Sequence, residues 1–172
     1  SPLIEDAPNI SQVEKIGILG TRGTISSQAF VRELEKINPE LKIYQQACPL
    51  LVPLVEEDYY LKKEAKMILR NYLRPLKQKK IDALILGCTH YPIMSKQIRQ
   101  IMGKNCRILN SGEIVAKSLV DYLARHPEIE VGLTKAGKAK FYTTDEVEKF
   151  KELGSKFLGQ KIKQVEKITL PT

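Results

Sequence analysis

Four short apolar runs, separated by stretches with the spacing of amphipathic helices, limit the fold of this chain more than any other feature. The runs cover residues 15–20, 41–46, 82–86 and 106–109. Each has the length of one buried strand, and the segments between them place apolar residues three or four positions apart. Strands that alternate with helices form a parallel sheet covered on both faces. We therefore predict an α/β fold, a three-layer sandwich with a mostly parallel sheet, over residues 12–110.

The connecting segments predict helices and turns. Pro53 interrupts an apolar stretch, which favours a loop or a short turn over a strand there. Pro92 has the fixed φ of a first helical residue, and Gly103 is suited to end the same helix. The expected connections are a loop over residues 21–24, a helix from Ser26 or Ser27 to Ile37, a buried loop or short helical turn over residues 50–55, a long helix over residues 59–76, and a helix from Pro92 to Gly103.

The sequence of residues 111–172 predicts only four further helices and strands. They are a helix over residues 112–123, a strand over 140–143, a helix over 145–158 capped by Thr144, and a strand over 164–170. These elements are too few to enclose a core of their own. We therefore expect this C-terminal segment to complete a second α/β domain whose N-terminal part is absent from the chain.

Composition restricts the class of protein. Lys and Arg number 28 against 20 Asp and Glu, a net charge of +8, but the lysines are spread over helical faces without interleaved aromatic residues. This pattern predicts a solvated surface, attractive to an anionic substrate, and no nucleic-acid partner. No apolar stretch approaches the roughly 20 residues that span a bilayer, so no membrane association is expected. Three cysteines are too few for a disulfide framework, which favours reduced thiols in a cytoplasm.

The sequence Gly87-Cys88-Thr89-His90-Tyr91-Pro92 directly follows the third apolar run. Its thiol is therefore expected at the carboxyl end of a strand, where open α/β sheets bind ligands. A helix N-terminus nearby would lower the pKa of Cys88, which could then act as an acid/base or a nucleophile. Thr89 could hold a substrate carboxylate, and His90 could relay protons. In the alternative interpretation Cys88 is a small buried apolar residue and His90 makes a local hydrogen bond. The spacing does not match a metal site.

The same hexapeptide resembles the second cysteine motif of the cofactor-independent glutamate racemases. Three further blocks resemble this family in the same order along the chain. They are residues 16–25, residues 47–56, and residues 141–144 with 165–170. The resemblance covers essentially the whole chain, and it implies a flavodoxin-like racemase domain with part of a second α/β domain.

The resemblance also implies an activity and its residues. Members of the family interconvert L- and D-glutamate without pyridoxal phosphate or metal, and they supply D-glutamate for peptidoglycan, cell-wall biogenesis and cell shape. Two cysteines exchange the Cα proton. The motif match implies catalytic roles for Cys88, His90 and Glu56, and substrate contacts for Thr89, His90, Thr21 and Thr24. The resemblance therefore implies a cytoplasmic homodimer that acts on glutamate.

The motif that carries the family's other cysteine is absent, and neither Cys48 nor Cys106 matches it. We expect Cys48 to be a buried structural thiol, and we expect the chain alone to be an inactive half-site. Two alternatives remain at this point. One is a related aspartate or hydantoin racemase, or a decarboxylase. The other is a non-catalytic α/β binding module in which Cys88 is inert.

Overall fold

A parallel sheet of four strands organises the first part of the chain in the computed structural model, which describes residues 13–135 and 137–170. The strands lie in the order β2-β1-β3-β4 and all neighbouring pairs are parallel. Their bounds are β1 Lys15–Gly20, β2 Lys42–Ala47, β3 Ala83–Leu86 and β4 Arg107–Leu109. The predicted α/β class and parallel sheet are confirmed. Strand order reverses at β1, so β1 and β3 flank a topological switch point.

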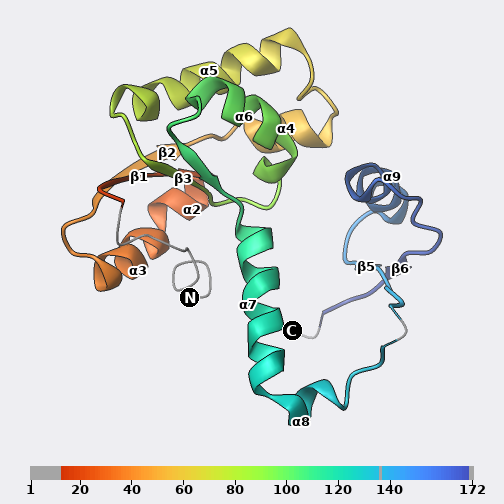
Figure 1. Ribbon diagram of the computed structural model, residues 1–172. Helices are drawn as coiled ribbons and strands as arrows, with labels where there is room; N and C mark the ends of the chain where they lie inside the picture. Colours follow the sequence, from red (N-terminus) through yellow and green to blue (C-terminus); the bar gives the residue numbers. More distant parts are fainter. Residues whose placement is uncertain (1–12, 136, 171–172) are drawn as a thin grey trace. The chain divides into compact units, whose positions relative to one another are not determined.

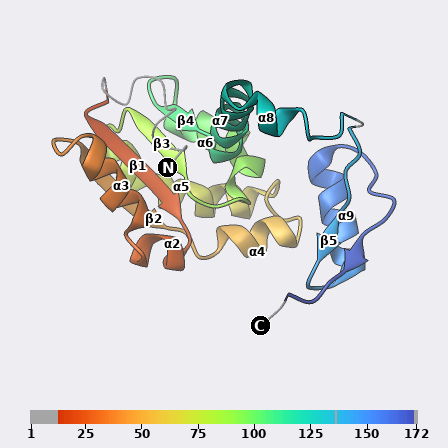
Figure 2. The ribbon, with the colours of Figure 1, turned by 90° about the horizontal axis from the view of Figure 1, so that it is seen from below.

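Each connection between strands contains two helical elements. Figures 1 and 2 show α2 and α3 on one side of the sheet and α5 and α6 on the other. The elements are α2 Arg22–Ser26, α3 Ala29–Ile37, α4 Leu51–Glu56, α5 Lys63–Gln78, the 3₁₀ helix η2 Tyr91–Met94, and α6 Ser95–Met102. Among the helices of the described residues, none has both the length and the hydropathy needed to cross a lipid bilayer.

Strand β3 separates two hydrophobic clusters. Leu84 and Leu86 pack in the cluster that contains the buried leucines of α5 and the apolar residues of α6. Ala83 and Ile85 point to the opposite face and pack in the cluster that contains Leu34 of α3. Because both faces of the strand are buried, all four of its residues are apolar, as is typical of parallel sheets.

The chain divides into two units at His126. The first unit ends with α7 Ser111–Arg125, which begins where the side chain of Asn110 accepts a hydrogen bond from the backbone N–H of Gly112. The second unit contains α8 Pro127–Glu130, α9 Val147–Leu158, and a short parallel pair formed by β5 Tyr142–Thr143 and β6 Glu166–Lys167. Ile162 is its one buried apolar residue within the described range. The predicted division at residue 110 stays a prediction.

Two boundaries near the predicted site differ from the sequence interpretation. The expected loop over residues 21–24 is instead the start of α2, because the Thr21 side chain caps that helix by accepting from the Thr24 N–H. Helix α3 starts at Ala29 and not at Ser26 or Ser27, since Gln28 adopts a left-handed conformation with φ 53°.

Other boundaries differ by a few residues. The long helix α5 begins at Lys63, later than predicted, and the segment after Cys88 is first a 3₁₀ turn, so that the α-helix starts only at Ser95. The predicted segment 50–55 lies almost entirely in the short helix α4 Leu51–Glu56, which agrees with one of the two predicted possibilities. The N-cap of helix α9 is Glu146 and not the predicted Thr144. Strand β6 is much shorter than the strand predicted over residues 164–170.

Candidate functional site

The carboxyl ends of β1 and β3 bring two loops together at the switch point. The N–H of Gly87 donates to the carbonyl of Leu19 at 2.8 Å, which extends the pairing of the two strands to their ends. Thr21 follows β1 directly, and Cys88 follows β3 after a single glycine. The hydroxyl of Thr24 donates to the Gly87 carbonyl at 3.3 Å and so joins the two loops. Ligands bind at this position in doubly wound sheets.

Cys88 is half-buried and its sulfur lies 3.9 Å from Nδ1 of His90. The backbone around it is fixed, because the N–H of Tyr91 donates to the Cys88 carbonyl at 3.2 Å. The thiol is therefore not sealed in the core, and the imidazole of His90 lies beside it. A sulfur that reaches solvent beside a histidine can exchange a proton with a ligand.

His90 connects this thiol to a carboxylate. Its Nε2 atom lies 3.2 Å from Oε1 of Glu56, and the two side chains are 30% and 37% exposed. A carboxylate oxygen only accepts hydrogen bonds, so the contact places a proton on Nε2. In the neutral ring, Nδ1 then carries the lone pair and faces the Cys88 sulfur. Helix α4 positions Glu56 as its last residue.

Thr21 and Thr24 form a hydroxyl pair beside the cysteine loop. Their Oγ1 atoms are 3.0 Å apart and both residues are half-buried. Close approach of the two loops depends on Gly87, where a Cβ atom would lie 3.1 Å from the Phe30 ring and 3.2 Å from the Leu19 carbonyl oxygen. Through the bond from Thr24 to the Gly87 carbonyl, the threonine pair holds the backbone of the cysteine loop. Thr89 is exposed between Cys88 and His90, and its contact with a substrate stays a prediction.

The Tyr91 hydroxyl makes a link that the sequence did not predict. It donates to the backbone carbonyl of Cys48 at 3.1 Å, and both residues are fully buried. Burial raises the pKa of Tyr91, so its hydroxyl stays protonated and keeps donating. This bond ties the loop after β2 to the loop after β3. The only sequence signal was an aromatic residue with a polar tip immediately before Pro92.

The other two thiols are buried. Burial raises the pKa of Cys48 well above its ordinary value, and its sulfur donates to the Gln46 carbonyl. Burial, with a smaller effect of the Asp82 charge, raises the pKa of Cys106 to about 11. Both therefore stay protonated near neutral pH. In the described part of the chain, His, Cys, Asp and Glu side chains do not gather in groups of three or more that could hold a metal ion.

Comparison with known proteins assigns the chain to a family. The profile of the Asp/Glu/Hydantoin racemase family matches residues 9–119. The chain belongs to this family, which confirms the resemblance inferred from the motif blocks.

Individual relatives are glutamate racemases. The chain is 33% identical over 164 residues to the glutamate racemase of Geobacter metallireducens, covering 95% of this chain and 60% of that protein. It is 38% identical over 155 residues to that of Bacillus cereus, covering 90% and 57%.

The solved structures that are similar to this chain include glutamate racemases as well. Glutamate racemase isoform RacE1 of Bacillus anthracis matches 99% of this chain and 63% of its own, with a TM-score of 0.86 and 33% identity. The Francisella tularensis enzyme in complex with D-glutamate matches 92% of this chain and 59% of its own, with a TM-score of 0.78 and 30% identity. The chain thus spans less than two thirds of the length of each relative.

Proposed function

We propose that this chain supplies the Cys88 half of a cofactor-independent glutamate racemase. The observation that carries the proposal is the series Cys88 Sγ, His90 and Glu56, with successive separations of 3.9 and 3.2 Å, at the carboxyl edge of the switch point. A thiol in this position is accessible to a ligand, and the adjoining imidazole can exchange a proton with it. The relatives that are glutamate racemases support glutamate as the substrate.

In the proposed reaction, the Cys88 thiolate removes the Cα proton from one enantiomer of glutamate. The new S–H bond takes the proton, and the electron pair of the broken C–H bond moves into the substrate carboxylate. A second thiol, supplied by residues outside this chain, returns a proton to the opposite face of Cα and leaves as thiolate. Donors that face the substrate carboxylate must stabilise the intermediate carbanion. The Thr89 hydroxyl is the group of this chain proposed for that role. The hydroxyl hydrogens of Thr21 and Thr24 are used within the pair and toward the Gly87 carbonyl, so this pair is proposed to border the substrate and to hold the cysteine loop.

His90 prepares the thiolate in this scheme. With its Nε2 proton directed to Glu56, Nδ1 can accept the thiol proton of Cys88. The resulting imidazolium lies beside the sulfur anion and the Glu56 carboxylate, and both of these negative charges stabilise it. Glu56 is therefore a positioning residue, since it acts on the reacting sulfur through the histidine.

We further propose that residues 111–172 complete a second domain together with chain that the longer relatives possess. Helix α7 supports this, because Val115 and Leu119, four positions apart, are 44% and 55% exposed. An amphipathic helix of a stable domain normally buries such a stripe. Because the motif with the family's other catalytic cysteine is absent from this chain, we expect the chain alone to be inactive as a racemase. The whole enzyme is proposed to be a cytoplasmic homodimer that supplies D-glutamate for peptidoglycan.

The family that the chain belongs to also contains aspartate and hydantoin racemases. A related reaction on one of those substrates is therefore the second candidate. A panel of L- and D-glutamate, aspartate and a 5-substituted hydantoin separates the two candidates by the substrate with the highest kcat/KM. A preference for glutamate supports the first candidate, and a preference for aspartate or the hydantoin supports the second.

The decisive experiment follows racemisation by circular dichroism in both directions, with the native gene product and its Cys88→Ala variant. The proposal predicts loss of both directions in that variant. The matched control is Cys106→Ala, which removes a buried thiol away from the candidate site and should retain activity. Unimpaired racemisation by Cys88→Ala would eliminate the mechanism.

A further inference from the structure

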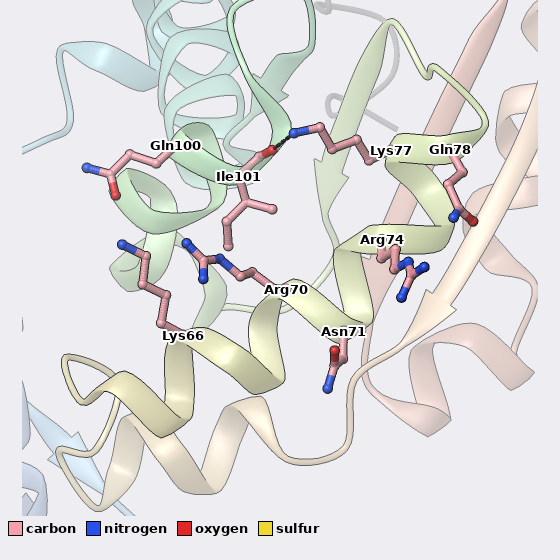
Figure 3. Close-up of a pocket in the computed structure, with 8 residues that line it drawn as sticks. All are labelled: Lys66, Arg70, Asn71, Arg74, Lys77, Gln78, Gln100 and Ile101. Atoms are coloured by element: carbon pink, nitrogen blue, oxygen red, sulfur yellow. Dashed lines mark hydrogen bonds between the residues drawn. The ribbon is translucent and has the colours of Figure 1, made fainter.

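A groove between α5 and α6 gathers positive charge on the first unit of the chain. Its volume is about 610 Å³, and Figure 3 shows the side chains that line it from both helices. The four cations all belong to α5, whereas α6 contributes a polar and an apolar residue. The cations are Lys66, Arg70, Arg74 and Lys77, the residues of α6 are Gln100 and Ile101, and Asn71 and Gln78 of α5 complete the lining. None of the residues that line the groove belongs to the candidate racemase site.

The spacing of the cations follows from helix geometry. Lys66, Arg70 and Arg74 recur every four residues, so they form one stripe on α5 that rises about 6 Å per step. Leu69 and Leu73 point the other way into the core and fix the rotation of the helix. The helix face that carries the stripe is therefore fixed in its orientation.

In the part of the chain that the structure describes, the charges of the stripe have no acidic partner in the groove. Within residues 13–135 and 137–170, the side chains of Lys66, Arg70 and Arg74 make no hydrogen bond or salt bridge, and no acidic residue lines the groove. Lys77 differs, because its Nζ donates to the Ile101 carbonyl and so connects the two helices. Like charges four residues apart destabilise a helix, so a bound anion would relieve their repulsion.

We propose that this groove binds a small molecule that carries two or more phosphate groups. The guanidinium groups of Arg70 and Arg74 have the planar, bidentate geometry that suits phosphate oxygens. The stripe covers about 12 Å of helix, more than one carboxylate can contact. Ile101 and the methylene stems of the cations add an apolar wall against which an organic group can pack. The groove volume lies in the range of small-molecule sites.

Two other occupants fit less well. Single-stranded nucleic acid is bound by basic grooves that also offer aromatic stacking partners, and none of the residues that line this groove is aromatic. A second copy of the chain related by two-fold symmetry would bring the same cations face to face, which repel one another. The proposal is independent of the racemase assignment, because it requires no residue of that site.

The test is isothermal titration calorimetry at low ionic strength, without divalent cations, using inorganic tripolyphosphate and ATP as probes. The native chain should bind at least one probe, with an affinity that falls as salt rises. The double variant Arg70→Gln, Arg74→Gln should bind about tenfold more weakly or worse. The matched control Lys36→Gln, Lys42→Gln removes two exposed charges from other elements and should stay within about threefold. Far-ultraviolet circular dichroism verifies that both double variants are folded.

The outcomes discriminate clearly. Tighter binding of ATP than of tripolyphosphate identifies an organic phosphate as the ligand class, and equal binding identifies the phosphate groups alone; both support the site. Equal weakening in the two double variants would show attraction to net charge only and overturn the proposal. Absence of binding to either probe at millimolar concentration would overturn it too, as would tighter binding of a single-stranded oligonucleotide than of either probe.

Discussion

His90 Nε2 lies 3.2 Å from Glu56 Oε1, and this contact joins the end of α4 to the turn after β3. On its other side, the same imidazole faces the sulfur of Cys88 at 3.9 Å. The ring is therefore held between an acceptor that fixes its tautomer and a thiol whose proton it can take. Two segments that are distant in sequence, the end of α4 and the turn after β3, therefore contribute to one proton-transfer unit.

Replacing Glu56 by Gln tests this unit. The amide keeps the size of the side chain but can donate to Nε2, which would favour the tautomer with its proton on Nδ1, facing Cys88. We expect kcat for glutamate racemisation by the native gene product to fall roughly 100-fold, with a smaller change in KM. The pH–rate profile should also shift, because the acid/base unit has changed.

The matched control is Glu35→Gln on α3, an exposed carboxylate outside the site. It should leave kcat and the pH profile unchanged. If Glu56→Gln matched this control in both measurements, Glu56 would have no positioning role.

The three thiols should differ in reactivity. Only a thiolate is alkylated, and burial raises the pKa of Cys48 far above its usual range and that of Cys106 to about 11. Cys88 is half-buried and lies beside an imidazole. Iodoacetamide at neutral pH, followed by peptide mass spectrometry, should therefore modify Cys88 first and by a wide margin. Equal rates at all three cysteines in the folded chain would support an inert Cys88.

The strands and the cysteine loop could be predicted from sequence because their signals are local. Each buried strand of a parallel sheet is a continuous apolar run, and the observed bounds of β1 are those predicted, Lys15–Gly20. The thiol at the end of β3 follows from its position directly after Leu86 and Gly87.

Other features carry no local signal. Helix α2 is only five residues long, too short to show a helical period, and it was predicted as a loop. The bond from Thr24 to the Gly87 carbonyl joins residues 63 positions apart, and the bond from Tyr91 to Cys48 joins residues 43 apart. Such contacts depend on the sheet order, which periodicity alone does not determine. The family resemblance implied a catalytic role for Glu56, whereas the spacing of the residues could not connect it with His90.

Tyr91→Phe should destabilise the first unit. The change removes the hydroxyl that donates to the buried Cys48 carbonyl, which keeps only the Leu51 N–H as a donor. The free energy of unfolding should fall by about 0.5–1.5 kcal/mol. Urea denaturation followed by circular dichroism measures the change. Tyr59→Phe is the matched control, since Tyr59 is 52% exposed, and it should stay within about 0.5 kcal/mol of the native chain.

Gly87, in the loop after β3, and Gly23, in helix α2, should respond oppositely to alanine. At Gly87 a Cβ atom would lie 3.1 Å from the Phe30 ring and 3.2 Å from the Leu19 carbonyl oxygen, and the backbone oxygen cannot move without disturbing β1. We expect Gly87→Ala to lower the free energy of unfolding by about 1–3 kcal/mol. It should also lower racemisation by the native gene product, because the displaced backbone is that of Cys88.

Gly23→Ala is the matched control on α2. Its Cβ atom would approach only Thr21 Oγ1, at 3.9 Å, so nothing has to move. Alanine also favours a helix over glycine by about 1 kcal/mol, so this variant should be as stable as the native chain or more stable. Urea denaturation measures both variants. Equal stability of the two would mean that the loops after β1 and β3 are not closely packed at Gly87.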